Sequence, residues 1–282
     1  MKCVVVFEEI QYHQIGSDPL SGKCYTHNDT YEILQVFSDG GTVLLNDNIY
    51  PLTRGSIYLI RGMLVHGTNP AIPESYCRNK VILKYSYIKH LFSLTELDAE
   101  GQETLESEGG YFPLTDEESK EADRLFFEIY ESYLENSSYA KTEITGNLLQ
   151  LLFLVFSFVK KKQPQPDLSS SRIGGILQYI NERLTEELSL DQIAAAVGIS
   201  KYYLCRLFRT KVGMTVLEYI AHRRLSLAKE KLIMTELSVA QIAFSAGFCN
   251  TSHFCRLFKQ QEGMSPNTFR GKYSLKAMRK RN

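Results

Sequence analysis

The chain has 282 residues, 44% of them apolar, and a formal net charge of zero. This composition excludes a disordered chain and allows one or two globular domains. The zero charge hides an asymmetry: residues 172–282 carry 18 Lys and Arg against 8 Asp and Glu, whereas residues 1–171 carry 14 against 24. A basic half joined to an acidic half predicts a nucleic-acid-binding domain beside a domain with another role. Surface charge for solubility is the alternative.

The cysteines and the apolar stretches indicate the compartment. The six cysteines form no CxxC pair and no zinc-ligand pattern, so we expect free thiols in a reducing cytosol. The most apolar stretch, residues 148–159, is 12 residues long, whereas about 20 residues are needed to span a bilayer. Because the N-terminus also lacks the apolar run of a signal peptide, we expect a cytoplasmic protein without a membrane segment.

Residues 4–87 are predicted to form strands and turns. The stretches "YEILQVFSDG", "GTVLLNDNIYPL" and "SIYLI" are rich in β-branched and aromatic residues and are separated by turn sequences. Asn46, Asp47 and Asn48 predict a tight hairpin, because Asn and Asp tolerate left-handed backbone conformations. Many short strands with regular turns indicate a small barrel or sandwich. The acidic residues 96–110 are predicted to form a loop or a short irregular segment.

Two helices and a linker are predicted after the strands. Thr115 is the expected N-cap of the first helix. The second runs from about residue 140 to residue 162, and its middle, Leu148–Val159, is apolar nearly all round. Such a helix must be buried on more than one face, so we expect a homodimer with the barrel on one side and a second subunit on the other. The alternative is burial entirely within one chain. Residues 163–171, rich in Pro and Ser, are the predicted linker.

The basic half is predicted to be helical throughout and to contain one motif twice. "SLDQIAAAVG" followed by "ISKYYLCRLFRTKVG" describes two short helices joined by a tight turn with Gly, which is a helix-turn-helix. "SVAQIAFSAG" followed by "FCNTSHFCRLFKQQEG" repeats it. One long amphipathic helix, from residue 215 to about residue 233, joins the two copies. Two recognition helices on such a rigid connection can enter successive major grooves about one helical turn apart.

Each recognition helix is predicted to have an inner and an outer face. The inner face should hold Leu204, Leu207, Phe208, Phe254, Leu257 and Phe258. The outer, DNA-facing set is Ser200, Lys201, Tyr202, Cys205, Arg206, Arg209, Asn250, Thr251, Ser252, Cys255, Arg256 and Lys259. Arg206 and Arg256 can pair bidentately with guanine, and Asn250 suits adenine or phosphate. Tyr202, Cys205 and Thr251 offer apolar contact to a thymine methyl. Arg209, Lys211 and Lys259 are expected on phosphates, which adds affinity without sequence information.

These motifs resemble the double helix-turn-helix domain of AraC/XylS-type bacterial transcription regulators. The resemblance covers about residues 173–273 and includes "YIAHRRLSLAKEKL" and the closing "GMSPNTFR". It implies a transcription regulator that binds promoter DNA. Cys205 and Cys255 depart from the family, in which longer polar side chains are common at these positions.

The acidic half resembles the cupin-like sensor domain that often precedes this DNA-binding domain. The residues that carry the resemblance are "HNDTYEILQVFSDGGTVLLNDNIYPLTRGSIYLIRGMLVHG". It implies an α+β chain of two domains. Residues 1–162 form a cupin-like β-barrel with a helical dimerisation segment, residues 163–171 a linker, and residues 172–282 an all-α double helix-turn-helix domain.

The cupin resemblance also implies a binding pocket. Metal-binding cupins use two His, a Glu and a third His, but Asp29 stands where the second His would be, so we expect no metal and no cofactor. A small organic effector is the expected ligand, by family analogy a sugar or another hydroxylated metabolite. The residues expected to face it are His27, Glu32 and His66, then Tyr12, Arg61 and Tyr85.

Three functions are compatible with this organisation. The favoured one is a transcription regulator that responds to a small ligand and is not an enzyme. The second is a metal-dependent cupin enzyme with an accessory DNA-binding domain, which the incomplete ligand set at Asp29 disfavours. The third is a regulator that responds to a protein partner or to temperature.

Overall fold

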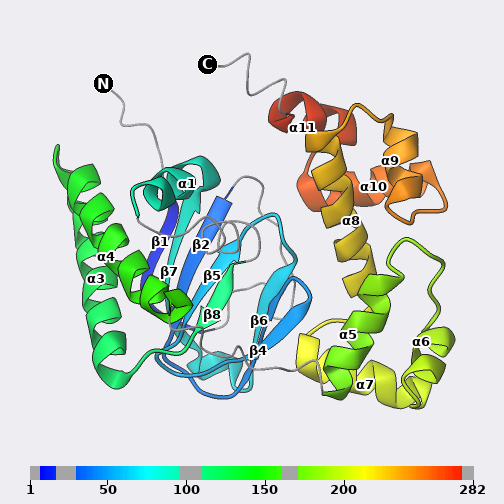
Figure 1. Ribbon diagram of the computed structural model, residues 1–282, viewed down its shortest axis with the longest axis horizontal. Coiled ribbons are helices and arrows are strands. Elements are labelled where there is room, and N and C mark those ends of the chain that lie inside the picture. The colour runs from blue at the N-terminus through cyan, green and yellow to red at the C-terminus, as the bar shows by residue number, and fades with distance from the viewer. Residues whose placement is uncertain (1–6, 17–29, 96–108, 161–170, 275–282) are drawn as a thin grey trace. The chain divides into compact units, whose positions relative to one another are not determined.

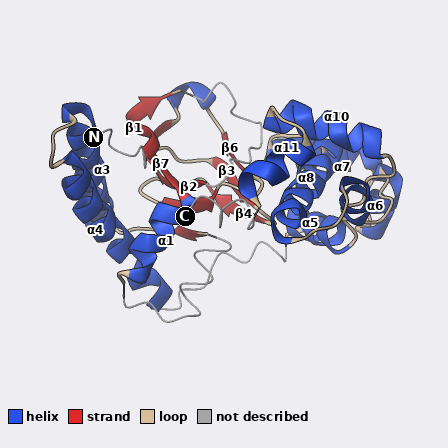
Figure 2. Ribbon diagram, turned by 90° about the horizontal axis from the view of Figure 1, so that it is seen from above, coloured by secondary structure: helices blue, strands red, loops and turns tan. Residues whose placement is uncertain are grey.

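The computed structural model describes residues 7–16, 30–95, 109–160 and 171–274. The chain divides into two compact units. The first comprises Met1–Leu168 with Lys211–Gly213, and the second comprises Ser169–Thr210 with Met214–Asn282. Figures 1 and 2 show that the strands lie in the first unit and that the described part of the second unit is helical. The mixed α and β composition with a C-terminal helical domain is confirmed. The predicted linker, except Ser171, lies outside the described residues.

The described residues of the first unit form two antiparallel sheets. The larger has the order β1-β7-β2-β5-β8 and the smaller β4-β3-β6. Their bounds are Phe7–Ile15 (β1), Thr30–Val36 (β2), Gly41–Leu45 (β3), Asn48–Pro51 (β4), Ile57–Arg61 (β5), His66–Pro70 (β6), Cys77–Lys84 (β7) and Gly110–Phe112 (β8). The predicted hairpin is confirmed, since Leu45 pairs with Asn48 and Asn46 has a φ of 52°.

The predicted closed barrel is not found in the described residues. β2 pairs with β5 and β7, whereas β3 pairs with β4 and β6, so no described ladder joins the two sheets. β8 was not predicted, because it begins at the end of the acidic stretch that indicated a loop. It adds an edge strand to β5. The arrangement resembles a two-layer sandwich more than a barrel.

Helices cover one face of the larger sheet, and the smaller sheet belongs to the other face. The helices are α1 (Tyr85–Ser93), α3 (Asp116–Glu135) and α4 (Ala140–Lys160), with a 3-10 turn, η1, at Pro73–Ser75. Along β2, alternate side chains point to opposite faces. Tyr31 and Ile33 join the core with the helices, whereas Leu34 and Val36 join a second core with residues of β3. β2 is therefore buried on both faces.

The helix pair α3–α4 corrects the prediction of how the apolar helix is covered. Thr115 forms the predicted N-cap of α3, in a capping box with Glu118. On α4, Leu148, Leu151, Leu152, Val155 and Phe156 are buried within the single chain. A second subunit is therefore not needed to cover most of this helix. This agrees with the alternative prediction, in which the helix is buried within one chain. Phe153 is the exception, with 71% of its surface exposed. None of the helices in the described parts of the chain is long and apolar enough to cross a bilayer.

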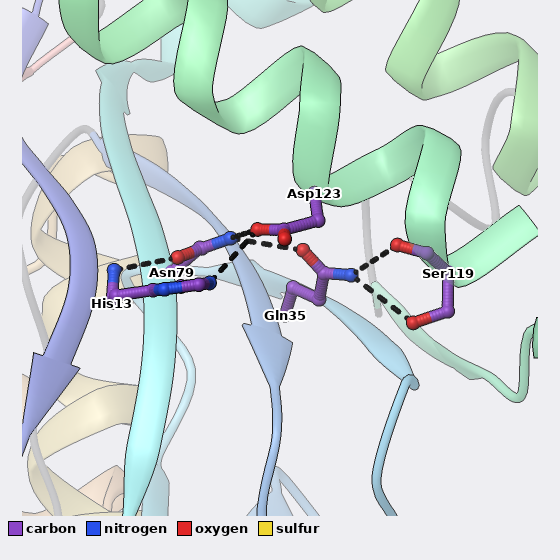
Figure 3. Close-up of polar contacts among 5 residues, drawn as sticks. All are labelled: His13, Gln35, Asn79, Ser119 and Asp123. Carbon is purple, nitrogen blue, oxygen red and sulfur yellow. Dashed lines mark hydrogen bonds and ion pairs between the residues drawn. The ribbon is translucent and has the colours of Figure 1, made fainter.

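A polar network ties the larger sheet to α3 (Figure 3). The buried Asn79 of β7 donates from Nδ2 to Gln35 Oε1 and to Asp123 Oδ1, both at 3.0 Å. Its Oδ1 accepts from the backbone N–H of His13 at 2.8 Å, and the His13 ring lies 3.0 Å from Asp123. Gln35 in turn donates to the carbonyl oxygen of Ser119. His13 has a φ of 43° at a bulge of β1, so Asn79 holds an unusual backbone conformation in place.

Asn79→Ala is expected to lower the free energy of unfolding of the first unit by roughly 1–3 kcal/mol, because it leaves buried donors and acceptors without partners. Urea unfolding followed by the tyrosine near-ultraviolet circular dichroism would measure the loss. Gln14→Ala, which removes an exposed amide from the same strand, is the matched control and should change little. Equal stability of the two variants would contradict a structural role for the network.

The second unit contains seven described helices. They are α5 (Arg172–Glu182), α6 (Leu190–Ala196), α7 (Lys201–Val212), α8 (Val216–Met234), α9 (Val239–Ser245), α10 (Thr251–Glu262) and α11 (Pro266–Tyr273). Capping boxes start α6, α8 and α9 at Ser189, Thr215 and Ser238. Gly247, between α9 and α10, has a φ of 90°, and a Cβ there would lie 2.8 Å from the carbonyl oxygen of Leu184. This turn therefore requires glycine. The predicted helix-turn-helix pairs and the long helix between them are confirmed.

Candidate nucleic-acid interface

The two predicted recognition helices, α7 and α10, each present one buried and one exposed face. Leu204, Phe208, Phe254 and Phe258 have no exposed surface, and Leu207 and Leu257 are half-buried. The inner faces are thus as the sequence predicted. These inner faces pack each helix against the neighbouring helices of the second unit, and this packing fixes which side chains point outward.

Most of the predicted DNA-facing residues are on the surface. Those that are exposed are Ser200, Lys201, Tyr202, Cys205, Arg206, Arg209, Asn250, Ser252, Arg256 and Lys259. Thr251 and Cys255 are half-buried. A half-buried Cys255 presents less of its side chain to a base than the sequence suggested. Contact of this set with DNA stays a prediction.

Two members of the set also have a structural role, which the sequence predicts for Ser200 and which was missed for Asn250. Ser200 Oγ accepts the backbone N–H of Tyr203, and Asn250 Oδ1 accepts those of Ser252 and His253 at 2.8 and 3.0 Å. Both side chains therefore cap the start of a recognition helix. Adenine needs an acceptor and a donor from the same amide. Because the cap occupies Oδ1, phosphate is the better target for Asn250. Both sit directly before an apolar helical run, which is the signal that indicates a cap.

The cationic side chains of α7 are held by local contacts. The guanidinium of Arg206 lies 6.0 Å from the ring centre of Tyr202 and 5.6 Å from that of Tyr203. Lys201 Nζ lies 2.9 Å from Asp191 Oδ2, and both side chains are largely exposed. Exposed ion pairs contribute little, so DNA phosphate can compete with Asp191 for Lys201. The aromatic contacts restrict Arg206 without removing its hydrogen-bond donors.

A buried ion pair fixes α10 on the connecting helix α8. Lys229 Nζ lies 3.0 Å from Glu262 Oε1, and the two side chains are 0% and 2% exposed. Burial lowers the pKa of Lys229, and the carboxylate of Glu262 opposes that shift. Since Glu262 is in the last turn of α10, the pair joins the end of the second recognition helix to the C-terminal half of α8.

We expect His222 of α8 to make the stability of the second unit depend on pH. Burial lowers the pKa of His222 below its usual 6.5, and Lys229 lowers it further, while Glu218 and Glu262 raise it. The unfolded chain therefore takes up a proton more readily than the folded one. The stability that the neutral His222 contributes is therefore fully present above about pH 6.5, the pKa of the unfolded chain. It is lost as the pH falls below that value.

We expect the melting temperature of the second unit to fall between about pH 8 and about pH 5.5, and His222→Gln to reduce this dependence. Differential scanning calorimetry at several pH values would check it. His253→Gln, which removes an exposed imidazole from α10, is the control. An unchanged pH dependence in His222→Gln would contradict the argument.

The predicted effector residues of the first unit fall into separate groups. Glu32 and His66 are buried, with Oε2 and Nε2 3.9 Å apart, and His66 Nδ1 lies 2.8 Å from the carbonyl oxygen of Leu64. Glu32 shares the face of β2 that is turned to the smaller sheet. The guanidinium of Arg61 lies 4.9 Å from the ring centre of Tyr85. Tyr12 and Tyr85 pack against the helix-side core, and Tyr12 stacks on His13.

The structure therefore brings together Glu32 with His66 and Arg61 with Tyr85, but it places Tyr12 and Tyr85 on the opposite face of the larger sheet from Glu32. The alternation of side chains along strands is the physical reason. His27 and Asp29 lie outside the described residues. Within the described residues, no group of three or more His, Cys, Asp or Glu side chains could hold a metal ion. An effector site stays a prediction.

Comparisons with known proteins concern mainly the second unit. A family model described as a helix-turn-helix domain matches residues 193–272. The chain is 43% identical over 101 residues to the HTH-type transcriptional activator AarP of Providencia stuartii. This match covers 36% of the chain and 75% of AarP. Three further curated relatives are matched over 33% to 45% of their own length.

Two comparisons extend over most of the chain. The HTH-type transcriptional activator RhaS of Escherichia coli is 25% identical over 252 residues, and the match covers 86% of each chain. Among solved structures, an apo ToxT variant from Vibrio cholerae is 15% identical with a TM-score of 0.39, covering 94% of this chain and 95% of that one.

Proposed function

The chain belongs to the AraC/XylS-type family of DNA-binding transcription regulators, and from that premise we propose that α7 and α10 read two successive major grooves of a promoter. The observation that carries the proposal is the repeated geometry of the two helices. In each, two aromatic or aliphatic side chains are buried on the inner face, and an exposed Arg lies two residues before the second of them, Arg206 before Phe208 and Arg256 before Phe258. The helix α8 joins the two copies, as a side-by-side placement on one face of a duplex requires.

We propose the same roles for the outward side chains as the sequence predicts. Arg206 and Arg256 pair with guanine, and Arg209 and Lys259 bind phosphates. The regulator is proposed to be an activator, as AarP and RhaS are named. Its domains are proposed at residues 1–162 and 172–282 with a linker at 163–171, and its compartment is the cytoplasm.

The first unit is proposed to be a cupin-like sensor for a small organic effector, without catalytic activity. The buried pair Glu32–His66 supports a polar site between the two sheets, because a carboxylate and an imidazole buried together suit hydrogen bonding to hydroxyl groups. Effector binding would alter transcription only by favouring one arrangement of the DNA-binding helices over another.

Selection of DNA from a random pool by the full-length protein tests the proposed function. We expect enrichment of two short boxes about one helical turn apart, with affinity falling steeply as salt rises from about 50 to about 200 mM. A variant with Arg124→Ala, an exposed cation of the first unit, is the matched control and should select the same boxes. Recovery of no motif, with and without a pool of metabolites, or binding indifferent to salt would contradict the proposal.

A homodimer through α3 and α4 is also proposed, on a smaller surface than the sequence suggested. Phe127 and Leu134 of α3 and Phe153 of α4 are exposed large apolar side chains. Phe153→Glu is expected to convert dimers to monomers in light scattering coupled to size exclusion, because it places a charge on the most exposed apolar side chain of the three. Ile72→Glu, at an exposed apolar residue outside these helices, should leave the mass unchanged. A dimer that persists in Phe153→Glu would contradict this interface.

Leu152→Glu does not test this interface. Leu152 is buried within one chain, so a charge at that position would disturb the core of the first unit.

A further inference from the structure

A hollow of about 600 Å³ lies within the second unit, beside the start of α10. Its sides are Leu188, the first half of α8, the turn that precedes α10, and residues of α10 from both its exposed and its half-buried positions. Leu217, Ile220 and Ala221 line it from α8, and Phe248 and Leu257 line it from the second helix-turn-helix. Its volume falls in the range of pockets that hold small organic molecules, roughly 300–1,000 Å³.

The apolar part of this hollow is not fully covered. Leu217 has 54% of its surface exposed although it lines a concave site. An exposed leucine in a hollow indicates a place where an apolar group can bind, because covering it removes apolar surface from water. A DNA phosphate would not do so, since phosphates are charged and hydrated and would leave the apolar floor wet.

The charged side chains of the lining are cationic. Arg224 and Arg256 border the hollow, together with the imidazole of His253, and no Asp or Glu is among the described residues that line it. Arg224 is held as a wall, because its Nε and Nη2 donate to the carbonyl oxygens of Leu184 and Glu186 at 2.8 and 2.6 Å. Arg256 and His253 are exposed and can turn toward an anion at the rim. An apolar floor with a cationic rim is complementary to an organic anion.

We propose that this hollow binds a small organic monocarboxylate, with its apolar tail against Leu217, Phe248 and Leu257 and its carboxylate on Arg256. Because Arg256 is also the side chain assigned to guanine in α10, the bound anion and DNA exclude each other. This second step rests on the proposed function, whereas binding of the anion does not. The hollow would thus give the DNA-binding unit an inhibitory site of its own.

Calorimetric titration of the full-length protein with 4-phenylbutyrate tests the binding step without DNA. The uncharged 4-phenyl-1-butanol should bind at least about tenfold more weakly, because it offers no charge to the rim. Leu217→Glu should weaken 4-phenylbutyrate by about tenfold or more, since it places a like charge in the apolar floor. Phe244→Glu, an equally exposed apolar position of the same unit outside the hollow, should bind as the wild type does.

Several outcomes would overturn the proposal. They are no heat of binding at millimolar 4-phenylbutyrate, equal affinity for the alcohol, or equal affinity of Leu217→Glu and wild type. In the second step, 4-phenylbutyrate should raise the apparent Kd for the selected DNA in the wild type and in Phe244→Glu but not in Leu217→Glu. Anion binding that leaves the DNA affinity of all three proteins unchanged would overturn the competition. Failure of the protein to bind any DNA would instead contradict the proposed function, while the titration without DNA still decides whether the hollow binds the anion.

Discussion

Lys229→Met is expected to lower the free energy of unfolding of the second unit by about 3–5 kcal/mol, which is the usual cost of removing one partner of a buried ion pair. The variant leaves the carboxylate of Glu262, 2% exposed, without the ammonium that lies 3.0 Å from it. Loss of the ammonium is costly, because the buried carboxylate is poorly solvated by water and the closest opposite charge has been removed. The methionine itself fits an aliphatic environment of similar size.

Hydrogen exchange followed by mass spectrometry would measure this effect unit by unit. Peptides from α8 and α10 should exchange faster in Lys229→Met, whereas peptides from β2 and β7 should be unchanged. The matched control is the double variant Lys229→Met with Glu262→Gln, which removes both charges and should recover most of the protection. If the single variant is as protected as the wild type, the pair does not hold α10 on α8.

The sequence could predict the features of this protein that depend on neighbouring residues. The helix starts at Ser189 and Thr215 follow from an N-cap with Gln or Glu three residues later, and the structure shows both capping boxes. The hairpin at Asn46 and Asp47 follows from local backbone preferences. The buried faces of α7 and α10 follow from helical periodicity alone.

Features that join distant segments could not be predicted in the same way. The division of the strands into two sheets depends on which strands pair, and alternation within a strand does not determine its partners. The contact of His13 with Asp123 joins residues 110 positions apart. The pair Lys229–Glu262 left a partial signal, because Lys229 lies on the buried stripe of α8 that includes Leu225 and Leu232. A charge at such a position indicates a buried partner, but the identity of that partner requires the fold.

Arg256→Ala is expected to cost about 1–3 kcal/mol of discrimination at one base pair of the selected site, or roughly five- to 150-fold. The reason is that a bidentate guanidinium contact is lost, and the guanine acceptors are then satisfied only by water. Arg206→Ala should have the same effect in the other box. Because the two arginines lie in different helix-turn-helix motifs, the losses in binding free energy should add. The double variant should therefore lose most of the specific binding. Competition gel-shift measurements with the selected site and with single base-pair changes would measure each loss.

Lys259→Ala separates base contact from phosphate contact on the same helix. Lys259 is exposed on α10 one turn after Arg256. As a phosphate ligand it should weaken all DNA sequences alike and reduce the slope of log K against log salt by about one. Arg256→Ala should instead weaken the selected site more than its altered versions. If Arg256→Ala weakens every sequence equally, Arg256 binds phosphate, and the guanine contact belongs to another residue of α10. Since Asn250 caps this helix through Oδ1, the exposed side chains of Ser252 and His253 would then be the next candidates for it.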